Sequence, residues 1–181
     1  MVSEAKQLIS EYQPAFDCEK GFKKEMLEFL DKHPDAFERS CLEGHFTASS
    51  WLLSQDGTKA LLLHHRKLDR WFQLGGHCDG DSDLLGVSIK EAQEESGITG
   101  IEAVSSEIFD LDIHGIPPFK NDPAHLHLDV RFLLKVVSDE EVVQNKESKE
   151  LRWFTKDDQI PGDNESVLRL RDKWRSGFKL S

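Results

Sequence analysis

Three glutamates lie close together in the stretch Leu74–Ile98, which reads LGGHCDGDSDLLGVSIKEAQEESGI. Glu91, Glu94 and Glu95 are spaced i, i+3 and i+4, so on a helix they would share one face. Like charges at this spacing weaken an isolated helix by roughly 0.2–0.5 kcal/mol per pair, and the negative end of the helix dipole adds to the penalty. A divalent cation such as Mg²⁺ or Mn²⁺ removes both penalties, because it takes hard oxygen ligands. The spacing therefore predicts a metal platform, with a solvated acidic face as the alternative.

The residues around the glutamates predict the elements that would position them. A helix is expected from about Asp83 to Ser96, and Gly97 follows it at a position that favours a left-handed cap. The pair Gly75 and Gly76 predicts a loop ahead of this helix. The glutamates would then occupy the last two turns of the helix.

This stretch resembles the box of the Nudix hydrolase family, G-x5-E-x7-R-E-U-x-E-E-x-G-U, where U is a bulky aliphatic residue. The spacing fits without a gap, and the positions that match are Gly76, Glu91, Glu94, Glu95, Gly97 and Ile98. Beyond the box, RKLDRWFQLGGH and SKELRWFTKDD look like the strands that flank it in this family. The resemblance extends from about Gly44 to Asp158, and the helices before it resemble extensions found in one bacterial branch.

Three positions depart from the box. Ser82 stands where the family has its first Glu, Lys90 where it has Arg, and Ala92 where it usually has a larger aliphatic residue. That Glu and that Arg commonly contact each other in the family, so the first two departures are linked: without the carboxylate there is less need for a planar guanidinium. Asp81 or Asp83 could pair with Lys90 instead.

The resemblance implies a fold of the α/β class, a Nudix-type α/β/α sandwich with a mixed sheet. It predicts a single domain over residues 1–181, with residues 1–43 as an N-terminal helical extension packed on it. The pattern of the chain agrees with this expectation. A helical period ends at Pro34, an Asp-Gly hairpin signal follows from residue 55, and residues 108–114 and 125–137 alternate as strands, the former with one wet side.

The resemblance also implies an activity and a metal. The reaction would be hydrolysis of a nucleoside diphosphate linked to another moiety, of the nucleotide sugar, ADP-ribose or nucleoside triphosphate type, with water attacking phosphorus. Glu91, Glu94 and Glu95, together with the carbonyl of Gly76, would hold Mg²⁺ or Mn²⁺. Such ions would neutralise the diphosphate and acidify the water, which a chain of net charge -11 needs in order to bind an anion.

The general base is expected to be Glu91, with Lys90 beside it as a second catalytic residue. Glu147 and Glu150 are alternatives for the base, because related enzymes take it either from the box or from a loop elsewhere. Geometry must decide among them.

Four residues are predicted to contact substrate: Arg66, Arg70, Phe119 and His127. The arginines lie upstream of the glycine pair and could contact phosphate, although ordinary exposed basic residues are an equal alternative. Phe119 lies in the proline-rich loop 115–124, which is a plausible pocket edge. Trp51, Trp71 and Trp153 favour core packing.

His125, His127 and Asp129 share one face of a predicted strand, and H-x-H can bind zinc. The pattern favours a polar sheet face near the substrate pocket over a second metal site. Cys78 lies inside the box loop, but Nudix chemistry needs no covalent step, so the thiol is interpreted as incidental.

Composition limits the classes of partner. The 23 Lys and Arg residues against 34 Asp and Glu disfavour nucleic-acid binding, because that affinity comes mostly from neutralising phosphates. No apolar stretch is long enough for a membrane span, and three unclustered cysteines suit free thiols and predict no structural zinc, so a cytoplasmic protein is expected. A homodimer is compatible with a small enzyme of this kind.

Two other functions compete with hydrolysis. A Nudix-like ligand-binding or regulatory module with lost or weak turnover is favoured by Ser82 and Lys90, and disfavoured by the three retained glutamates. An isoprenoid diphosphate isomerase would need a protonating cysteine and histidine-rich metal ligation, which the box pattern does not offer.

Overall fold

The computed structural model describes residues 2–118, 123–144, 146, 148–162 and 164–177. These residues form four helices and seven strands in the order α1 Val2–Glu11, α2 Asp17–Lys32, β1 Gly44–Leu53, β2 Lys59–His65, β3 Arg70–Phe72, β4 Leu74–His77, α3 Leu84–Ser96, β5 Ile101–Ile116, β6 His125–Val136, β7 Ser148–Thr155 and α4 Glu165–Arg175. The predicted α/β class with a mixed sheet is confirmed. Within the described part of the chain, no helix combines the length and apolarity that a membrane crossing requires.

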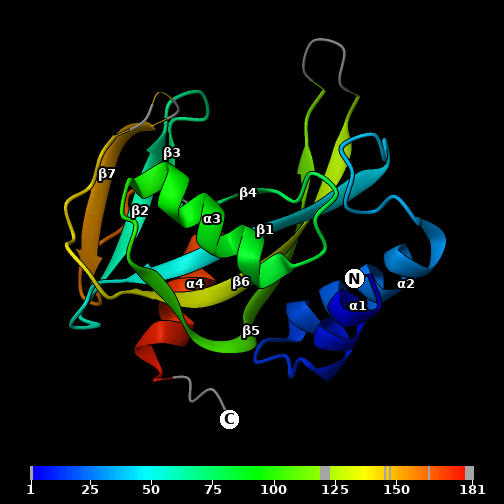
Figure 1. Cartoon of the computed structure of the whole chain (residues 1–181), viewed down its shortest axis with the longest axis horizontal. Coiled ribbons are helices and arrows are strands. Elements are labelled where there is room, and N and C mark those ends of the chain that lie inside the picture. Colours follow the sequence, from blue (N-terminus) through cyan, green and yellow to red (C-terminus); the bar gives the residue numbers. More distant parts are fainter. Residues whose placement is uncertain (1, 119–122, 145, 147, 163, 178–181) are drawn as a thin grey trace.

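The sheet is built around β1. Its strand order is β3-β2-β1-β6-β5, with β4 paired to β1 and β7 paired to β2. Strands β1 and β6 are parallel, and the other pairs are antiparallel. Figure 1 shows α3 lying across one face of the sheet and α4 behind the other. The hairpin predicted at the Asp-Gly signal is the β1–β2 connection.

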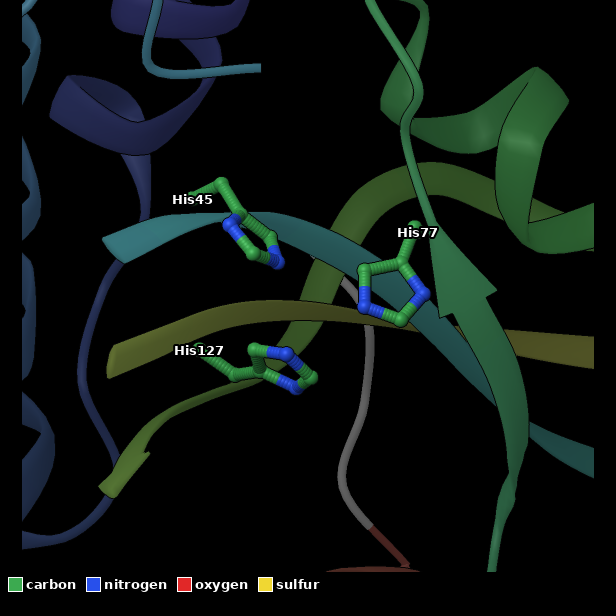
Figure 2. A group of neighbouring side chains, drawn as sticks. All are labelled: His45, His77 and His127. Atoms are coloured by element: carbon green, nitrogen blue, oxygen red, sulfur yellow. The ribbon is translucent and has the colours of Figure 1, made fainter. Parts of the chain in front are cut away.

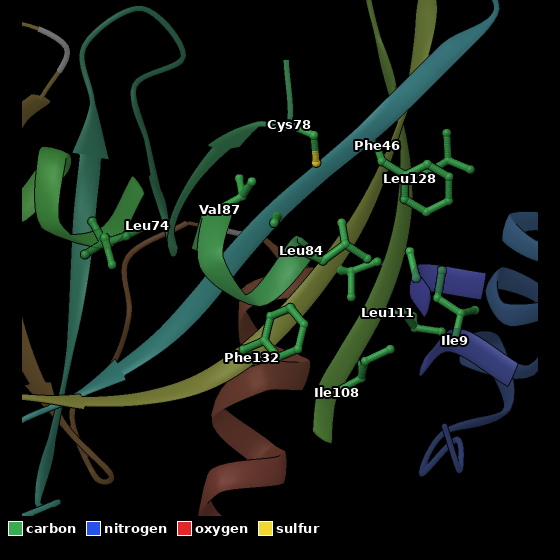
Figure 3. Packing of buried hydrophobic residues seen from close by; sticks show 14 of the residues in the cluster. Ile9, Phe46, Leu74, Cys78, Leu84, Val87, Ile108, Leu111, Leu128 and Phe132 are labelled. Carbon is green, nitrogen blue, oxygen red and sulfur yellow. The ribbon is translucent and has the colours of Figure 1, made fainter. Parts of the chain in front are cut away.

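Each face of the sheet has its own apolar cluster, because successive residues of a strand point to opposite faces. Phe46 and Leu52 of β1 belong to the cluster that includes Leu84 and Val87 of α3, while Trp51 packs with residues of α4. Figure 3 shows the α3-side cluster, in which Leu84 and Val87 approach the strands. The two layers therefore fix the helices on opposite sides of β1.

Helix α3 begins and ends where the sequence predicted. The side chain of Asp83 caps its first turn by accepting a hydrogen bond from the backbone nitrogen of Gly86, at 3.0 Å. Gly97 ends it in the left-handed conformation, with φ of 75°. The hydroxyl of Ser88 donates to the carbonyl of Ser49 at 2.9 Å, which anchors the helix to β1.

The N-terminal helices contact the strands directly. The helical period predicted before Pro34 is two helices, α1 and α2, separated by residues 12–16. Ile9 and Met26 have no exposed surface and belong to the α3-side cluster. Figure 3 shows Ile9 beside Leu111 of β5. These helices thus cover apolar surface that the strands would otherwise expose.

The prediction of a wet side for residues 108–114 is wrong, because Asp110 and Asp112 are buried. Arg131 of β6 places Nη1 3.1 Å from Asp110 and Nη2 3.1 Å from Asp112. The guanidinium of Arg169, on α4, lies 2.8 Å from each of the two carboxylates. Burial alone would raise the pKa of Asp110, but Arg169 and Arg131 outweigh it and hold that pKa below its usual range. The charged groups are sealed under α4 as ion pairs rather than solvated.

The buried ion pairs continue from α4 to the N-terminal helices. Lys173 of α4 places Nζ 2.6 Å from Asp110, donates to the hydroxyl of Tyr12 at 2.8 Å and forms an ion pair with Glu19 of α2. Glu19 also accepts from the backbone nitrogen of Phe16 at 2.8 Å. One polar network therefore connects α2, α4 and β5.

Arg169→Ala is expected to lower the free energy of unfolding by roughly 3 kcal/mol, because it leaves buried carboxylates with one cation fewer. Arg171→Ala on the same helix is the control, since Arg171 forms an ion pair with the half-exposed Asp172 at 3.3 Å and its loss should cost about 0–1 kcal/mol. Urea denaturation of the three proteins measures both values.

The effect of Arg169→Ala should depend on pH in a defined direction. The pKa values of Asp110 and Asp112 are lowered in the folded protein, so their stabilisation is present above the ordinary pKa of about 3.9 and is lost as the pH falls through the lowered values. The difference between wild type and variant should narrow below about pH 4. A difference that stays constant from pH 7 to pH 3 would contradict this account.

Candidate functional site

The carboxylate of Glu91 lies directly against the backbone of β4. A Cβ atom built on Gly76 would approach Oε2 of Glu91 to 2.3 Å, so a side chain at position 76 would occupy the place of the carboxylate. Glu91 is half-buried there. The absence of a side chain at Gly76 is what lets α3 present this oxygen to the strand.

Glu95 is fixed on the neighbouring glycine. The backbone nitrogen of Gly75 donates to Oε2 of Glu95 at 2.8 Å. A Cβ atom on Gly75 would lie 2.1 Å from Cβ of Ser49 and 2.7 Å from the carbonyl oxygen of Ala48, because β4 runs close beside β1. Glycine is required at both positions for reasons of space, one set by a carboxylate and the other by a strand.

The acidic face of α3 is electrostatically unfavourable as it stands. Burial raises the pKa of Glu91, the charge of Glu94 raises it further, and Lys90 opposes both. Lys90 and Glu94 are exposed, with Nζ and Oε1 3.8 Å apart, a separation that is worth little in water. Three carboxylates on one face, two of them tied to glycine backbone, are a donor set of hard oxygens that fits Mg²⁺ or Mn²⁺.

Comparison with known proteins agrees with the resemblance read from the box. The family model described as NUDIX domain matches residues 44–170, which is more than half of the chain. The chain belongs to the Nudix hydrolase family. The matched residues include every strand of the sheet and all of α3.

Solved structures share the Nudix fold at low sequence identity. A Nudix-family hydrolase from Clostridium perfringens is 24% identical with a TM-score of 0.55, and covers 75% of this chain and 98% of its own. An ADP-ribose pyrophosphatase from Streptococcus suis is 20% identical with a TM-score of 0.53, covering 75% of this chain and 93% of its own. A protein described as UDP-X diphosphatase is 15% identical with a TM-score of 0.53, and covers 99% of this chain and 92% of its own. No curated protein matches the chain in sequence.

The structure gives the departing positions of the Nudix box different partners from those suggested by the sequence. Asp83 caps α3, and Asp81 accepts a hydrogen bond from the backbone nitrogen of Asp83 at 2.9 Å. Lys90 pairs with Glu94 instead of either aspartate. Ser82 is half-buried at the start of the helix.

The other predicted site residues lie in different surroundings. Arg66 is exposed, and its guanidinium donates to the backbone carbonyls of Lys146 and Ser148, at 3.2 and 2.9 Å. Arg70 is exposed at the first position of β3. Glu150 forms an ion pair with Arg152 at 2.7 Å.

Two predicted residues, Phe119 and Glu147, lie outside the described residues. Trp51 and Trp71 are buried in the α4-side cluster, as expected for core aromatics. Cys78 is also buried, and burial, with the charge of Asp129 adding to it, raises the pKa of its thiol. A thiol held protonated in this way is a poor nucleophile, in agreement with an incidental role.

His127 lies in a histidine cluster that the sequence had not connected. Its ring centroid is 5.0 Å from that of His45 on β1 and 4.9 Å from that of His77 on β4. Strand register produces this meeting, because His45 pairs with His127 and Thr47 pairs with His77. Burial lowers the pKa of His77 to about 4 and of His127 to about 2, and neighbouring cationic groups add to both shifts. Only the H-x-H of β6 gave any local sequence signal.

Substituting each glycine of β4 by alanine separates the two spatial constraints. Gly75→Ala should lower the free energy of unfolding by about 1–3 kcal/mol, because the new methyl group meets the backbone of β1. Gly76→Ala should cost less than about 1 kcal/mol, since a carboxylate can move, yet it should weaken Mn²⁺ binding by displacing Glu91. Urea denaturation and calorimetric Mn²⁺ titration measure the two effects.

Gly115→Ala is the matched control, because a Cβ atom there meets nothing within 4 Å. It should change neither stability nor Mn²⁺ affinity. Equal losses of stability in Gly75→Ala and Gly76→Ala, or unchanged Mn²⁺ affinity in Gly76→Ala, would show that the contact between Gly76 and Glu91 does not shape the metal site.

Proposed function

We propose that this Nudix hydrolase is a divalent-metal-dependent pyrophosphohydrolase that cleaves the diphosphate of a nucleoside diphosphate linked to a second group. The observation that carries the proposal is the placement of the Nudix box glutamates. Glu91 and Glu95 meet the glycine backbone of β4, and Glu94 lies on the same helix face.

The residues proposed to hold Mg²⁺ or Mn²⁺ are Glu91, Glu94 and Glu95, with the carbonyl of Gly76. They fit such an ion because their donors are hard oxygens, and because burial and the charge of Glu94 raise the pKa of Glu91, effects that a bound cation would offset. When bound, the ion would supply charge neutralisation of the diphosphate and acidification of water. Nucleic acid and membranes are not proposed as partners.

Glu91 is the residue that we propose as general base. Its raised pKa moves toward the neutral range in which a base is most effective, and its half-buried position restricts access of bulk water. Glu150 is engaged by Arg152 and is less suited to accept a proton. Lys90 would act by stabilising the ionised form of Glu91, since its positive charge lowers the pKa that burial raises.

Contacts to substrate are proposed from the exposed cations. The guanidinium of Arg66 already donates to two backbone carbonyls, which supports a role in joining β7 to the loop after β2. Arg70 is the better candidate for phosphate contact. His127 is half-buried on β6 with its ring against those of His45 and His77, on the sheet face opposite Glu91, so it is not proposed as a contact to the diphosphate.

The substrate class is proposed as a nucleotide sugar, ADP-ribose or a nucleoside triphosphate. Structures that share the fold include one described as UDP-X diphosphatase, which matches the N-terminal helices as well as the sheet, and one described as ADP-ribose pyrophosphatase. We favour a diphosphate joined to a second group over a triphosphate, because the fold shared along 99% of this chain carries that description.

Glu94→Gln and Glu95→Gln are each expected to lower Mn²⁺- or Mg²⁺-dependent formation of nucleoside monophosphate by at least about 100-fold. Loss of a ligand should cost no less than loss of a residue that supports one, which typically costs about 10–100-fold. The measurement is kcat/KM over a panel of nucleoside diphosphate compounds, with EDTA as the metal-free reference.

Glu28→Gln on α2 is the control for that experiment, because Glu28 lies outside the box and pairs with the exposed Lys24 at 3.8 Å. Its kcat/KM should equal that of wild type. Turnover that survives EDTA, or that is equal in wild type and both box variants, would reject the metal-dependent mechanism. No turnover by wild type on any compound of the panel would leave a ligand-binding module as the better proposal.

Restoring the two departing positions provides a further test. Ser82→Glu combined with Lys90→Arg should leave kcat/KM equal to or higher than wild type, because a bidentate pair would then support Glu91 from the start of α3. A decrease of more than about tenfold, larger than a single lost supporting contact usually causes, would show that Lys90 has a function that arginine cannot supply.

A further inference from the structure

Three histidines from three strands converge on one point at the α4 side of the sheet. Figure 2 shows the rings of His45, His77 and His127 facing a common space between β1, β4 and β6. One ring nitrogen from each lies within 4.8 Å of the others. His45 belongs to a strand whose pairing with both neighbours is fixed residue by residue, so the convergence is built into the sheet.

His45 is the unusual member of the group. Its side chain is only 4% exposed, and neither ring nitrogen has a hydrogen-bond partner among the described residues. Burial lowers the pKa of His45. The backbone of Cys41 opposes this lowering, but it does not meet the geometry of a hydrogen bond to either ring nitrogen. Leaving a buried polar group without a partner typically costs about 1–3 kcal/mol, a cost that a ligand bound to a ring nitrogen of His45 would offset.

We propose that His45, His77 and His127 bind a borderline transition-metal ion, Zn²⁺ in the first place, at a site separate from the acidic face of α3. Imidazole nitrogen suits Zn²⁺, whereas Mg²⁺ and Mn²⁺ prefer oxygen, so the two donor sets select different ions. Three histidines leave one position open for water or another group. The proposal goes beyond the hydrolase function and does not depend on it.

The surroundings supply further donors. His125 lies beside the group, with its Nε2 atom 3.3 Å from that of His127, and its Nδ1 atom is 2.9 Å from the carbonyl of Pro123. His114 is held by Asp112 at 3.0 Å, with its ring 5.5 Å from that of His127. His125 is therefore the nearest candidate for a fourth ligand, while His114 is turned toward a carboxylate.

The charges around the group balance. Arg39 and Asp79 both act on His77, and they form an ion pair with each other at 2.8 Å. The ion pair contributes no net charge, so it neither attracts nor repels a cation strongly. Binding would then rest on the three ring nitrogens that lie within 4.8 Å of one another.

The site is separated from the box glutamates of α3 by strand β4, which carries both Gly76 and His77. Gly76 faces Glu91, and the next residue, His77, points to the opposite face, where it meets His45 and His127. A metal at the histidines would therefore not replace one at the glutamates. This separation makes independent tests possible.

The test is a titration of metal-free full-length protein with Zn²⁺ and with Co²⁺ in a Glu94→Gln/Glu95→Gln background, which removes binding at the acidic face. We expect one equivalent of Zn²⁺ per chain by calorimetry, a visible Co²⁺ spectrum of a low-symmetry nitrogen-ligated ion, and a higher Tm with Zn²⁺. Failure of the hydrolase proposal would leave these results unchanged, since no turnover is measured.

His77→Ala and His127→Gln in the same background should each weaken Zn²⁺ binding by at least about 100-fold and abolish the visible Co²⁺ spectrum. Both residues are half-buried, so their variants should fold even if a variant of the fully buried His45 does not. His64→Gln is the matched control, because His64 lies on β2 and pairs with Asp69 at 2.9 Å. It should bind as the parent does.

Absence of Zn²⁺ binding in the parent protein would overturn the proposal. Equal Zn²⁺ affinity in His127→Gln, His77→Ala and His64→Gln, with each variant folded by circular dichroism, would also overturn it, because the ion would then lie elsewhere.

Discussion

The contact between two carboxylates of α3 and the glycine backbone of β4 is the constraint on which the acidic site depends. It couples three separate features of the chain. Gly75 is required because β4 lies against Ser49 and Ala48 of β1, Gly76 because Glu91 lies against it, and α3 is held over both by the bond from Ser88 to Ser49. A shift in the register of β4 on β1 would move Gly75 and Gly76 away from the glutamates. The half-buried carboxylate of Glu91 would then lie against the side chain of another residue of β4.

The opposite face of the sheet holds a network of buried ion pairs. Four acidic groups are buried there with three cations: Glu19, Asp110, Asp112 and Asp129 against Arg131, Arg169 and Lys173. Removing so many charges from water is costly, and the cost is offset only because nearly every oxygen has a close partner. Asp129 shows the geometric consequence. It accepts from Thr47 at 3.0 Å and from Ser49 at 2.7 Å, so the network also joins β6 to β1, two residues from His45 and His127.

Local sequence signals identified the elements whose causes are local. Asp83 and Gly97 cap α3, so both ends of that helix could be predicted from side chains within it or next to it. The polar alternation of β5 was interpreted as exposure to water, which is wrong, because Arg169 and Lys173 arrive from a helix more than fifty residues further along the chain. Nothing in a strand reveals whether its polar face meets solvent or a charged helix.

The histidine cluster could not be predicted for a related reason. His45, His77 and His127 are far apart in the sequence, and they meet only because β1 pairs with β6 in parallel on one side and with β4 antiparallel on the other. Parallel pairing has no short-range sequence signature, since its partners are joined by long connections. The sequence pattern pointed only to the H-x-H of His125 and His127, and it favoured a polar sheet face near the substrate pocket over a second metal site.

Strand β4 lies between a set of oxygen donors on one face of the sheet and a set of nitrogen donors on the other. Its residues alternate between the two faces of the sheet, so Gly76 meets the oxygen donors of α3, and His77 meets the nitrogen donors of β1 and β6. Cys78, which follows β4, is again on the α3 side and belongs to the core there. Oxygen and nitrogen donors select different ions when they are kept apart, and a mixed set would bind transition metals at the expense of Mg²⁺. The alternation of side chains along a single strand is enough to keep them apart. The same register that brings Gly76 to Glu91 therefore determines that His77 cannot reach it.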